Sequence, residues 1–345
     1  MIYYIGLFIY IFIVYIFSLI IKNKKRGRKF FFILVCLGII LFQGFRDFSV
    51  GIDLIGYIPS YTKIGNIPIS NFFDIINLKY QNYEKGYILL NKIIFLLGCS
   101  EREFLIIITG IIQIPIFYTF YKYSENYLLS IFWYFSFGNF LMTFSGLRQS
   151  IVMALCFFAY RFIKNKNLYK FICIIIFASL FHKSAMFCLL LYPLYYLNID
   201  KRKIIIIFAV LLSLFLMKEK FLIIAGKLYK GRIVLIEHTG AYTMFIFYLV
   251  LYLYSLMFQS RDKDYRGLRN ILFLLLLTFI FAPIHSTFTR ISYPLTLYMC
   301  LFIPKLLKTM DKKYQLVYKV AILTFEILSF YYLLGILQTL PFKFG

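Results

Sequence analysis

Long apolar runs dominate the chain and decide what it can fold into. The first of them, residues 2–21, is long enough to cross about 30 Å of hydrocarbon as a helix. Because a bilayer offers no hydrogen-bond partners to the backbone, such runs are expected to satisfy their own polar groups as helices. With 62% hydrophobic and 21% aromatic residues, the composition excludes an ordinary soluble domain. The sequence therefore predicts an all-α polytopic membrane protein.

The apolar runs predict about twelve membrane-crossing helices. The expected crossings are 2–21, 30–45, 104–121, 127–144, 147–163, 168–181, 184–197, 204–217, 241–258, 270–284, 291–307 and 314–335. One further run, 88–98, is too short to cross and suits a re-entrant or interfacial helix. No internal repeat and no soluble domain interrupts the pattern, so 1–345 is expected to form a single integral membrane domain.

The basic residues predict which side of the membrane each loop faces. The chain has 38 Lys and Arg against 14 Asp and Glu, and the densest basic block, 22–29, directly follows the first run. Cytoplasmic loops are enriched in Lys and Arg, so this block places the N-terminus outside. The same rule accounts for the net charge of +24 without a nucleic-acid partner. Because the block follows the run, the run is expected to be a retained helix and not a signal peptide.

With this topology the unusual polar residues fall on the outer side of the membrane. A long polar loop, 46–86, follows the second crossing, and another, 218–240, lies later in the chain. The polar residues at the outer junctions are Arg46, Asp47, Asp53, Glu84, Arg148, Gln149, His182, Lys183, His285 and Arg290. Several unrelated junctions are thus expected to contribute to one membrane-level site.

Arg148 is the most informative of these residues, because it lies between two long apolar runs where a bare charge is costly. A guanidinium group presents a fixed fork of donors that matches phosphate oxygens. Two or three outer arginines therefore predict an anion site at the lipid boundary, to which a lipid-linked pyrophosphate would be suited. Nearby tyrosines offer flat amphipathic surfaces for sugars, namely Tyr57, Tyr61, Tyr80, Tyr83 and Tyr87.

Each of these residues also has a purely structural interpretation. Arg46 and Asp47 could form an interfacial ion pair, and Arg148 could cap the junction between two helices. His182 could be a packing residue, and the tyrosines could belong to an aromatic belt at the membrane interface. The six cysteines and three histidines show no metal-ligand spacing, so no metal or other cofactor is expected. The prediction of a site depends on the joint occurrence of these residues on one side.

The order of these motifs resembles that of a known family. The matching segments are Arg46-Asp47, Gly51-Ile52-Asp53 with Tyr57, Glu84-Lys85-Gly86-Tyr87, Gly146-Leu147-Arg148-Gln149, Phe181-His182-Lys183-Ser184, and Arg290 with Tyr293. They are similar to motifs of the EpsG-like bacterial exopolysaccharide polymerases, which are related to the Wzy polymerases. Two departures are visible: Leu54 follows Asp53 where the family usually has an aromatic residue, and 218–240 has no counterpart.

The resemblance implies a membrane glycosyltransferase with a fold similar to that of the GT-C enzymes. Such an enzyme joins undecaprenyl-pyrophosphate-linked oligosaccharide units on the outer face of the bacterial cytoplasmic membrane. It moves the growing glycan from its lipid pyrophosphate to a sugar hydroxyl of an incoming unit. The implied partners are membrane lipid, a chain-length regulator and a flippase.

The converging charges give a hypothesis for the reaction. Arg148 and Arg290 hold the donor pyrophosphate and stabilise the charge that develops as it leaves. One of the carboxylates Asp53, Asp47 and Glu84 takes the proton from the attacking hydroxyl, and His182 orients or assists. Further substrate contacts are expected from Arg46, Gln149, Tyr57, Lys183 and Tyr87.

Three other activities have to be weighed against a polymerase. A glycan ligase of the same class would differ only in its acceptor. A lipid-linked oligosaccharide flippase would need ionisable residues along a path through the membrane, and only Glu326 lies deep in an apolar run. An integral acyltransferase would want a His paired with an acid and cytoplasmic donor contacts, whereas His182 and His285 are expected outside.

Overall fold

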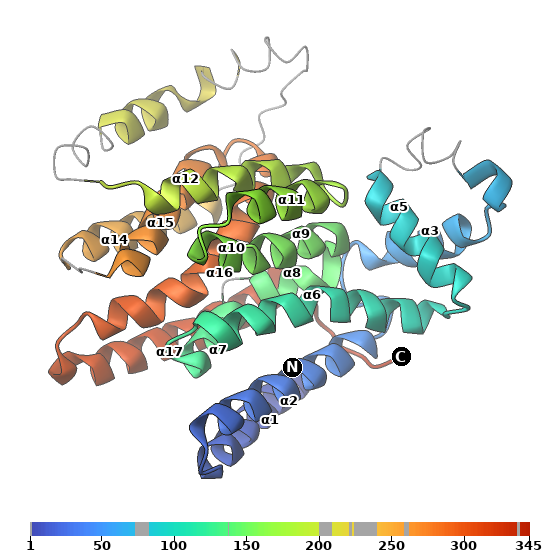
Figure 1. The fold of residues 1–345 in the computed structure, drawn as a ribbon, viewed down its shortest axis with the longest axis horizontal. Coiled ribbons are helices and arrows are strands. Elements are labelled where there is room, and N and C mark those ends of the chain that lie inside the picture. Colours follow the sequence, from blue (N-terminus) through green and yellow to red (C-terminus); the bar gives the residue numbers. More distant parts are fainter. Residues whose placement is uncertain are drawn as a thin grey trace. The chain divides into compact units, whose positions relative to one another are not determined.

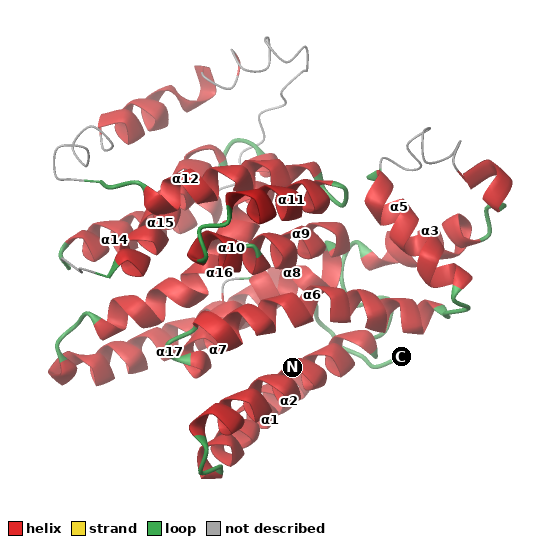
Figure 2. Cartoon of the chain, in the orientation of Figure 1, coloured by secondary structure: helices red, strands yellow, loops and turns green. Residues whose placement is uncertain are grey.

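A computed structural model describes residues 2–72, 83–136, 138–199, 209–220, 223, 240–258, 262–336 and 339–345 (Figure 1). Within these ranges the chain forms helices and short connections and no β-strand, as Figure 2 shows. One isolated bridge pairs Arg46 with Phe344. The all-α prediction is confirmed for this part of the chain.

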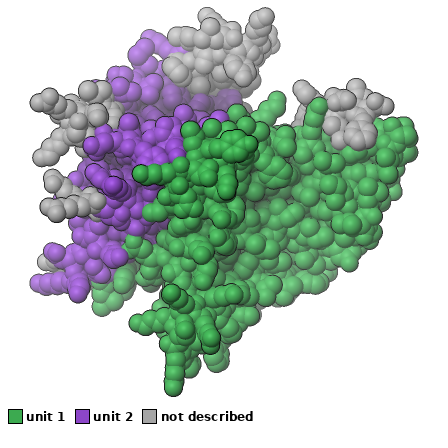
Figure 3. Space-filling model, viewed as in Figure 1, with its two compact units in different colours: residues 1–186, 316–345 green, residues 187–315 purple. Residues whose placement is uncertain are grey.

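The chain divides into two compact units (Figure 3). Unit 1 contains residues 1–186 and 316–345, and unit 2 contains residues 187–315. The sequence predicts a single domain and does not mark this division, because apolar runs and basic loops continue across it.

Unit 1 is built on three long helices. They are α1 (Ile2–Ile20), α2 (Lys24–Gly44) and α6 (Glu101–Tyr123), with α2 packed against both of the others. Arg28 of α2 donates hydrogen bonds to the carbonyls of Phe120 and Ser124 at the end of α6, at 3.1 and 2.7 Å. The Phe120 carbonyl also accepts the N–H of Ser124, so these bonds reinforce the C-terminal cap of α6.

Candidate membrane spans are fewer than the sequence predicts. Among the described residues α1, α2 and α6 are long and apolar enough to cross a bilayer, so the chain is a multi-pass membrane protein. A fourth span exists if α7 (Tyr127–Ser136) and α8 (Asn139–Ser145), which meet at 53°, count as one. Between them Gly138 has a φ of 76°, a left-handed conformation that glycine adopts readily.

Several predicted crossings are divided into short helices. A helix of 12 residues rises about 18 Å, which is less than the thickness of the hydrocarbon core. Twelve spans and a GT-C-like arrangement are therefore not confirmed. The short elements are α9 (Leu147–Phe158), α10 (Tyr160–Lys164), α11 (Leu168–Ser179), the 3₁₀ helix η2 (Lys183–Leu190) and α12 (Leu191–Tyr196).

Unit 2 is centred on α15 (Lys263–Phe281) and α16 (Ser286–Lys308), which pack against each other. The neighbouring helices are α14 (Gly240–Leu256) and α17 (Lys312–Ile336), the second of which continues into unit 1. Lys305 of α16 is buried and pairs with Asp262 and Asp264 at 3.0 and 3.1 Å, which joins one end of α15 to α16.

The predicted crossing 204–217 is described only from residue 209, where the chain is helical. Most of the predicted outer loop 218–240 lies outside the described residues.

The first predicted outer loop contains two helices, α3 (Leu54–Gly65) and α5 (Lys85–Leu96), which pack against each other. The second of them occupies most of the 88–98 run, so a short helix is present there as predicted. Lys92 of α5 is buried and donates to the carbonyls of Gly65 and Ile67 at 2.6 and 2.7 Å. The end of α3 is thus fastened to α5.

Candidate functional site

The candidate site forms within unit 1, where α8 ends and α9 begins. The first outer loop is fastened to this junction, because the hydroxyl of Ser145 accepts a hydrogen bond from the N–H of Ile52 at 3.0 Å. Gly51 lies against the carbonyl oxygen of Phe144, and a Cβ added to Gly51 would come within 2.4 Å of that oxygen. These contacts bring Asp53 and the start of α3 to the N-terminus of α9.

Arg46 is buried at the same junction and acts as a brace. Its guanidinium nitrogens donate to the carbonyl oxygens of Gln43, Val50 and Phe144 at 2.6, 3.1 and 2.8 Å. The side chain is 0% exposed, and its charge lies 5.0 Å from the centre of the Phe144 ring. Arg46 therefore joins α2, the outer loop and α8, and offers no accessible donor to a ligand, in contrast to the predicted substrate contact.

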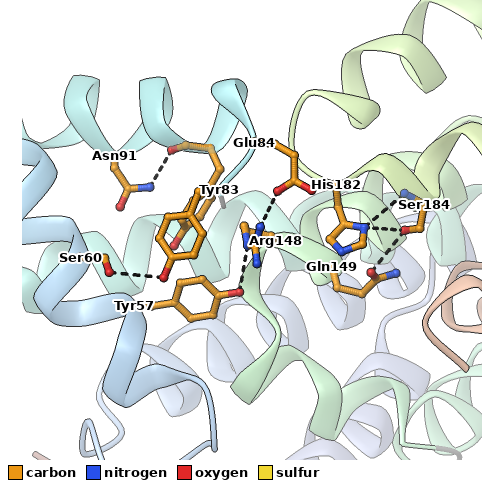
Figure 4. A network of polar contacts seen from close by, with 10 residues as sticks. Tyr57, Ser60, Tyr83, Glu84, Asn91, Arg148, Gln149, His182 and Ser184 are labelled. Carbon is orange, nitrogen blue, oxygen red and sulfur yellow. Dashed lines mark hydrogen bonds and ion pairs between the residues drawn. The ribbon is translucent and has the colours of Figure 1, made fainter. Parts of the chain in front are cut away.

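Arg148, in the first turn of α9, is the centre of a polar network (Figure 4). Its Nη1 forms an ion pair with Oε2 of Glu84 at 2.5 Å. Its Nε donates to the hydroxyl of Tyr57 at 3.3 Å, and its guanidinium lies 4.6 Å from the centre of the Tyr83 ring. The arrangement combines a charged partner, a phenol and an aromatic face around one cation.

Three tyrosines support this cation as a cluster. The rings of Tyr57 and Tyr83 stack at 5.8 Å, and Tyr87 meets both edge-on at 5.5 and 5.4 Å. Tyr87 is fully buried, so it supports the other two rings from behind. Burial raises the pKa of Tyr57, and the charge and hydrogen bond of Arg148 only partly oppose this shift. Tyr57 therefore stays a neutral hydrogen-bonding phenol at physiological pH.

His182 lies in the turn after α11, beside the same network. Its Nδ1 accepts the N–H of Ser184 at 3.2 Å and lies 2.9 Å from the Ser184 hydroxyl. That hydroxyl reaches Oε1 of Gln149 at 3.3 Å. Because Nδ1 accepts from a backbone N–H, a neutral His182 ring carries its proton on Nε2. The turn is tied to α5 by the N–H of Gly86, which donates to the carbonyl of Leu180 at 2.9 Å.

The three candidate carboxylates have different surroundings. Asp47 accepts hydrogen bonds from the hydroxyl and N–H of Ser49 at 2.6 and 2.9 Å, which lower the pKa of its carboxyl group. Asp53 is the exposed N-cap residue of α3, but its side chain makes no capping hydrogen bond. Glu84 precedes α5 and pairs with Arg148, so it is the carboxylate next to the guanidinium that could bind an anion.

Two further predicted residues lie on other elements. Lys183 is exposed at the start of η2. Arg290 is exposed in α16, after His285, whose Nδ1 accepts the N–H of Thr287. Because Arg290 belongs to unit 2, its pairing with Arg148 stays a prediction.

Two contacts were not foreseen from the sequence, namely the Tyr83 ring against Arg148 and the Ser184 hydroxyl between His182 and Gln149. The sequence does place both residues next to predicted site residues, since Tyr83 directly precedes Glu84 and Ser184 follows His182 by two residues.

This arrangement is suited to binding an anion. Arg148 supplies a partly exposed cation, and the N-terminus of α9 adds the positive end of a helix dipole. Within the described ranges, no group of three or more His, Cys, Asp and Glu side chains could hold a metal ion.

Comparison with curated proteins gives no match, and neither does comparison with solved structures. The sequence pattern of the EpsG family matches residues 29–344 and so includes every residue of the network around Arg148. The chain therefore belongs to the EpsG family, whose members are membrane proteins of the exopolysaccharide polymerase type.

Proposed function

We propose that this protein polymerises undecaprenyl-pyrophosphate-linked oligosaccharide units on the outer face of the bacterial cytoplasmic membrane. The observation that carries the proposal is the partly exposed Arg148, held at a helix N-terminus and already paired with a carboxylate at 2.5 Å. A guanidinium that holds a carboxylate in this way has the geometry to hold phosphate oxygens. A lipid-linked pyrophosphate supplies that anion together with an apolar tail for the membrane.

In the proposed reaction Arg148 binds the pyrophosphate of the donor. A hydroxyl of the acceptor unit attacks the anomeric carbon of the donor glycan, and the bond from that carbon to the pyrophosphate breaks. Arg148 stabilises the negative charge that develops on the departing oxygen. Arg290 is proposed as a second cation at the same anion.

The remaining polar groups of the network are proposed to position the substrates. Tyr83, which is partly exposed next to the cation, is proposed to contact a sugar, and the buried Tyr57 supports its ring. His182, whose Nδ1 is held by Ser184, is proposed to orient a phosphate or sugar oxygen. A flippase that delivers units and a regulator of chain length are the proposed protein partners.

Replacing Arg148 tests the proposal directly. We expect Arg148→Ala to abolish polymer and to leave single lipid-linked units accumulating, because the charge on the leaving pyrophosphate is no longer stabilised. Arg148→Lys should also lose most polymer, since a point charge cannot reproduce the donor fork. The products are measured by gel electrophoresis of the glycan and mass spectrometry of the lipid-linked pool.

A matched control is Arg161→Ala. Arg161 of α10 also packs against aromatic rings, at 5.1 Å from that of Phe158, but it belongs to no part of the site. This variant should keep its polymer. Polymer of normal length from Arg148→Ala, in protein that is folded and inserted, would refute the site.

The acceptor separates a polymerase from a ligase. Purified protein supplied with lipid-linked units alone should produce a ladder of products, because each unit serves as donor and as acceptor. A ligase would give no product until a second kind of acceptor is added.

A further inference from the structure

Glu84 and Arg148 form a half-buried ion pair within this network. Their side chains are 15% and 21% exposed, so the pair is shielded from solvent more than a surface pair. The Nε and one face of the same guanidinium are used by Tyr57 and Tyr83. Glu84 therefore occupies a donor group of Arg148 that an incoming phosphate would need.

A pyrophosphate can displace this carboxylate. It carries more charge than one carboxylate and offers several oxygens to the fork of donors. Glu84 is also free to turn away without loosening α5, because it precedes that helix but its side chain makes no hydrogen bond to the helix end. The carboxylate of Glu84 thus occupies the position on Arg148 that the proposed function gives to the pyrophosphate of the substrate.

We infer that Glu84 is the catalytic base and that donor binding activates it by taking Arg148 away from it. The inference rests on the proposed function and deepens it. A carboxylate held by a guanidinium has a lone pair engaged and is a poor proton acceptor. When the pyrophosphate takes over Arg148, the carboxylate of Glu84 is released beside the bond that reacts.

The proton and electron pairs balance in this scheme. Glu84 takes the proton of the acceptor hydroxyl while the hydroxyl oxygen forms its bond to the anomeric carbon. The bond from that carbon to the pyrophosphate breaks, and the pyrophosphate leaves with the electron pair, held by Arg148. Glu84 then gives its proton to solvent, and it pairs with Arg148 again when the lipid pyrophosphate departs.

The other two carboxylates lack this coupling. Asp47 is held by Ser49, and Asp53 is exposed at the start of α3. Neither forms an ion pair with Arg148 in the described part of the chain. With Glu84 as the base, the acceptor hydroxyl is activated only when a donor is bound.

The test separates binding from turnover, with undecaprenyl pyrophosphate that carries no sugar as the probe, in lipid nanodiscs. In Glu84→Gln the competing negative charge is gone, so we expect the probe to bind several-fold more tightly than to the unmodified protein. Polymer synthesis should fall about 10²-fold or more, since loss of a general base has effects of that size. A change that only disturbed the structure would weaken binding as well as synthesis.

The variant should fold, because Gln is nearly isosteric with Glu and the side chain of the N-cap residue Glu84 makes no capping hydrogen bond to α5. If its thermal midpoint nevertheless falls, Glu84→Asp serves instead, since the shorter chain keeps the charge but withdraws it from Arg148. We expect it to bind the probe more tightly and to synthesise less. Glu101→Gln is the matched control, because Glu101 accepts a hydrogen bond from Thr62 away from the site, and it should change neither quantity.

Two results would overturn the inference, namely weaker binding by Glu84→Gln or polymer synthesis at the normal rate. Failure of the proposed function gives a different result. In that case Arg148→Ala would bind undecaprenyl pyrophosphate as tightly as the unmodified protein does.

Discussion

Arg46 and Arg148, both in unit 1, have different surroundings, and their partners distinguish them. Arg46 gives its donors to backbone carbonyls, whereas Arg148 gives them to the side chains of Glu84 and Tyr57. A sequence shows which residues are charged but not which carbonyl oxygens come within reach after folding. The sequence could therefore predict both arginines for one side of the membrane. It could not distinguish the buried brace, Arg46, from the candidate anion-binding residue, Arg148.

Gly51 gives a prediction at the scale of a single residue. Its φ is 112°, and an added Cβ would lie 2.4 Å from the carbonyl oxygen of Phe144. Gly51→Ala should therefore destabilise the protein by about 1–3 kcal/mol and lower polymer synthesis, because the outer loop can no longer close on α8. Thermal midpoints in detergent and polymer yield measure the two effects.

The matched control is Gly56→Ala. Gly56 lies in α3, and an added Cβ there meets nothing within 4 Å, so this change should be neutral or slightly stabilising. Equal midpoints for the two alanine variants would contradict the role assigned to Gly51.

At the scale of elements, the sequence predicted long uninterrupted helices better than broken ones. The runs 2–21 and 104–121 correspond closely to α1 and α6. The run 127–144, in contrast, breaks at Gly138. An apolar run predicts burial in protein or lipid but not continuity, because a glycine with a left-handed φ is as apolar as its neighbours.

Helix α5 gives a prediction at this scale. Its outward residues Leu89, Ile93 and Leu96, with Leu97 directly after the helix, are all apolar and well exposed, and they lie in the run predicted to be re-entrant or interfacial. About 18 Å of helix cannot cross the bilayer, so we expect this face to lie in the outer leaflet. The pair of Glu84 and Arg148, at the start of α5, would then lie near the lipid headgroups.

Tryptophan fluorescence checks this depth. Trp133 is the one tryptophan of the chain, so Ile93→Trp in a Trp133→Phe background reports on α5 alone. Lipids brominated on their acyl chains should quench this residue strongly. They should quench Lys63→Trp, at an exposed cationic position on α3, much less. Equal quenching at the two positions would show that the apolar face does not enter lipid.

At the scale of the whole molecule, the sequence predicted a class of protein and much of one site, but not the complete site. Tyr57, Glu84, Arg148, Gln149 and His182 lie in one network of contacts or directly beside it, although they are far apart in the sequence. Arg290 lies in unit 2, so its part in the site depends on the orientation of both units in the membrane.

The orientation is predicted by the basic residues and can be measured by labelling with a membrane-impermeant maleimide. Cys99 and Cys173 are replaced by serine first, because the other four cysteines are buried. Single cysteines are then placed at exposed positions, Lys85→Cys beside the site in unit 1 and Thr287→Cys near Arg290 in unit 2. Both should react in intact cells, since both units are predicted to present these ends to the outer face.

The control position is Lys24→Cys, in the basic block where α2 begins. It is exposed in the structure and predicted to be cytoplasmic, so it should react only after the membrane is permeabilised. Labelling of Thr287→Cys only in permeabilised cells would place Arg290 on the opposite side from Arg148. It would remove Arg290 from the proposed anion site while leaving the pair of Arg148 and Glu84 intact, because that pair lies wholly within unit 1.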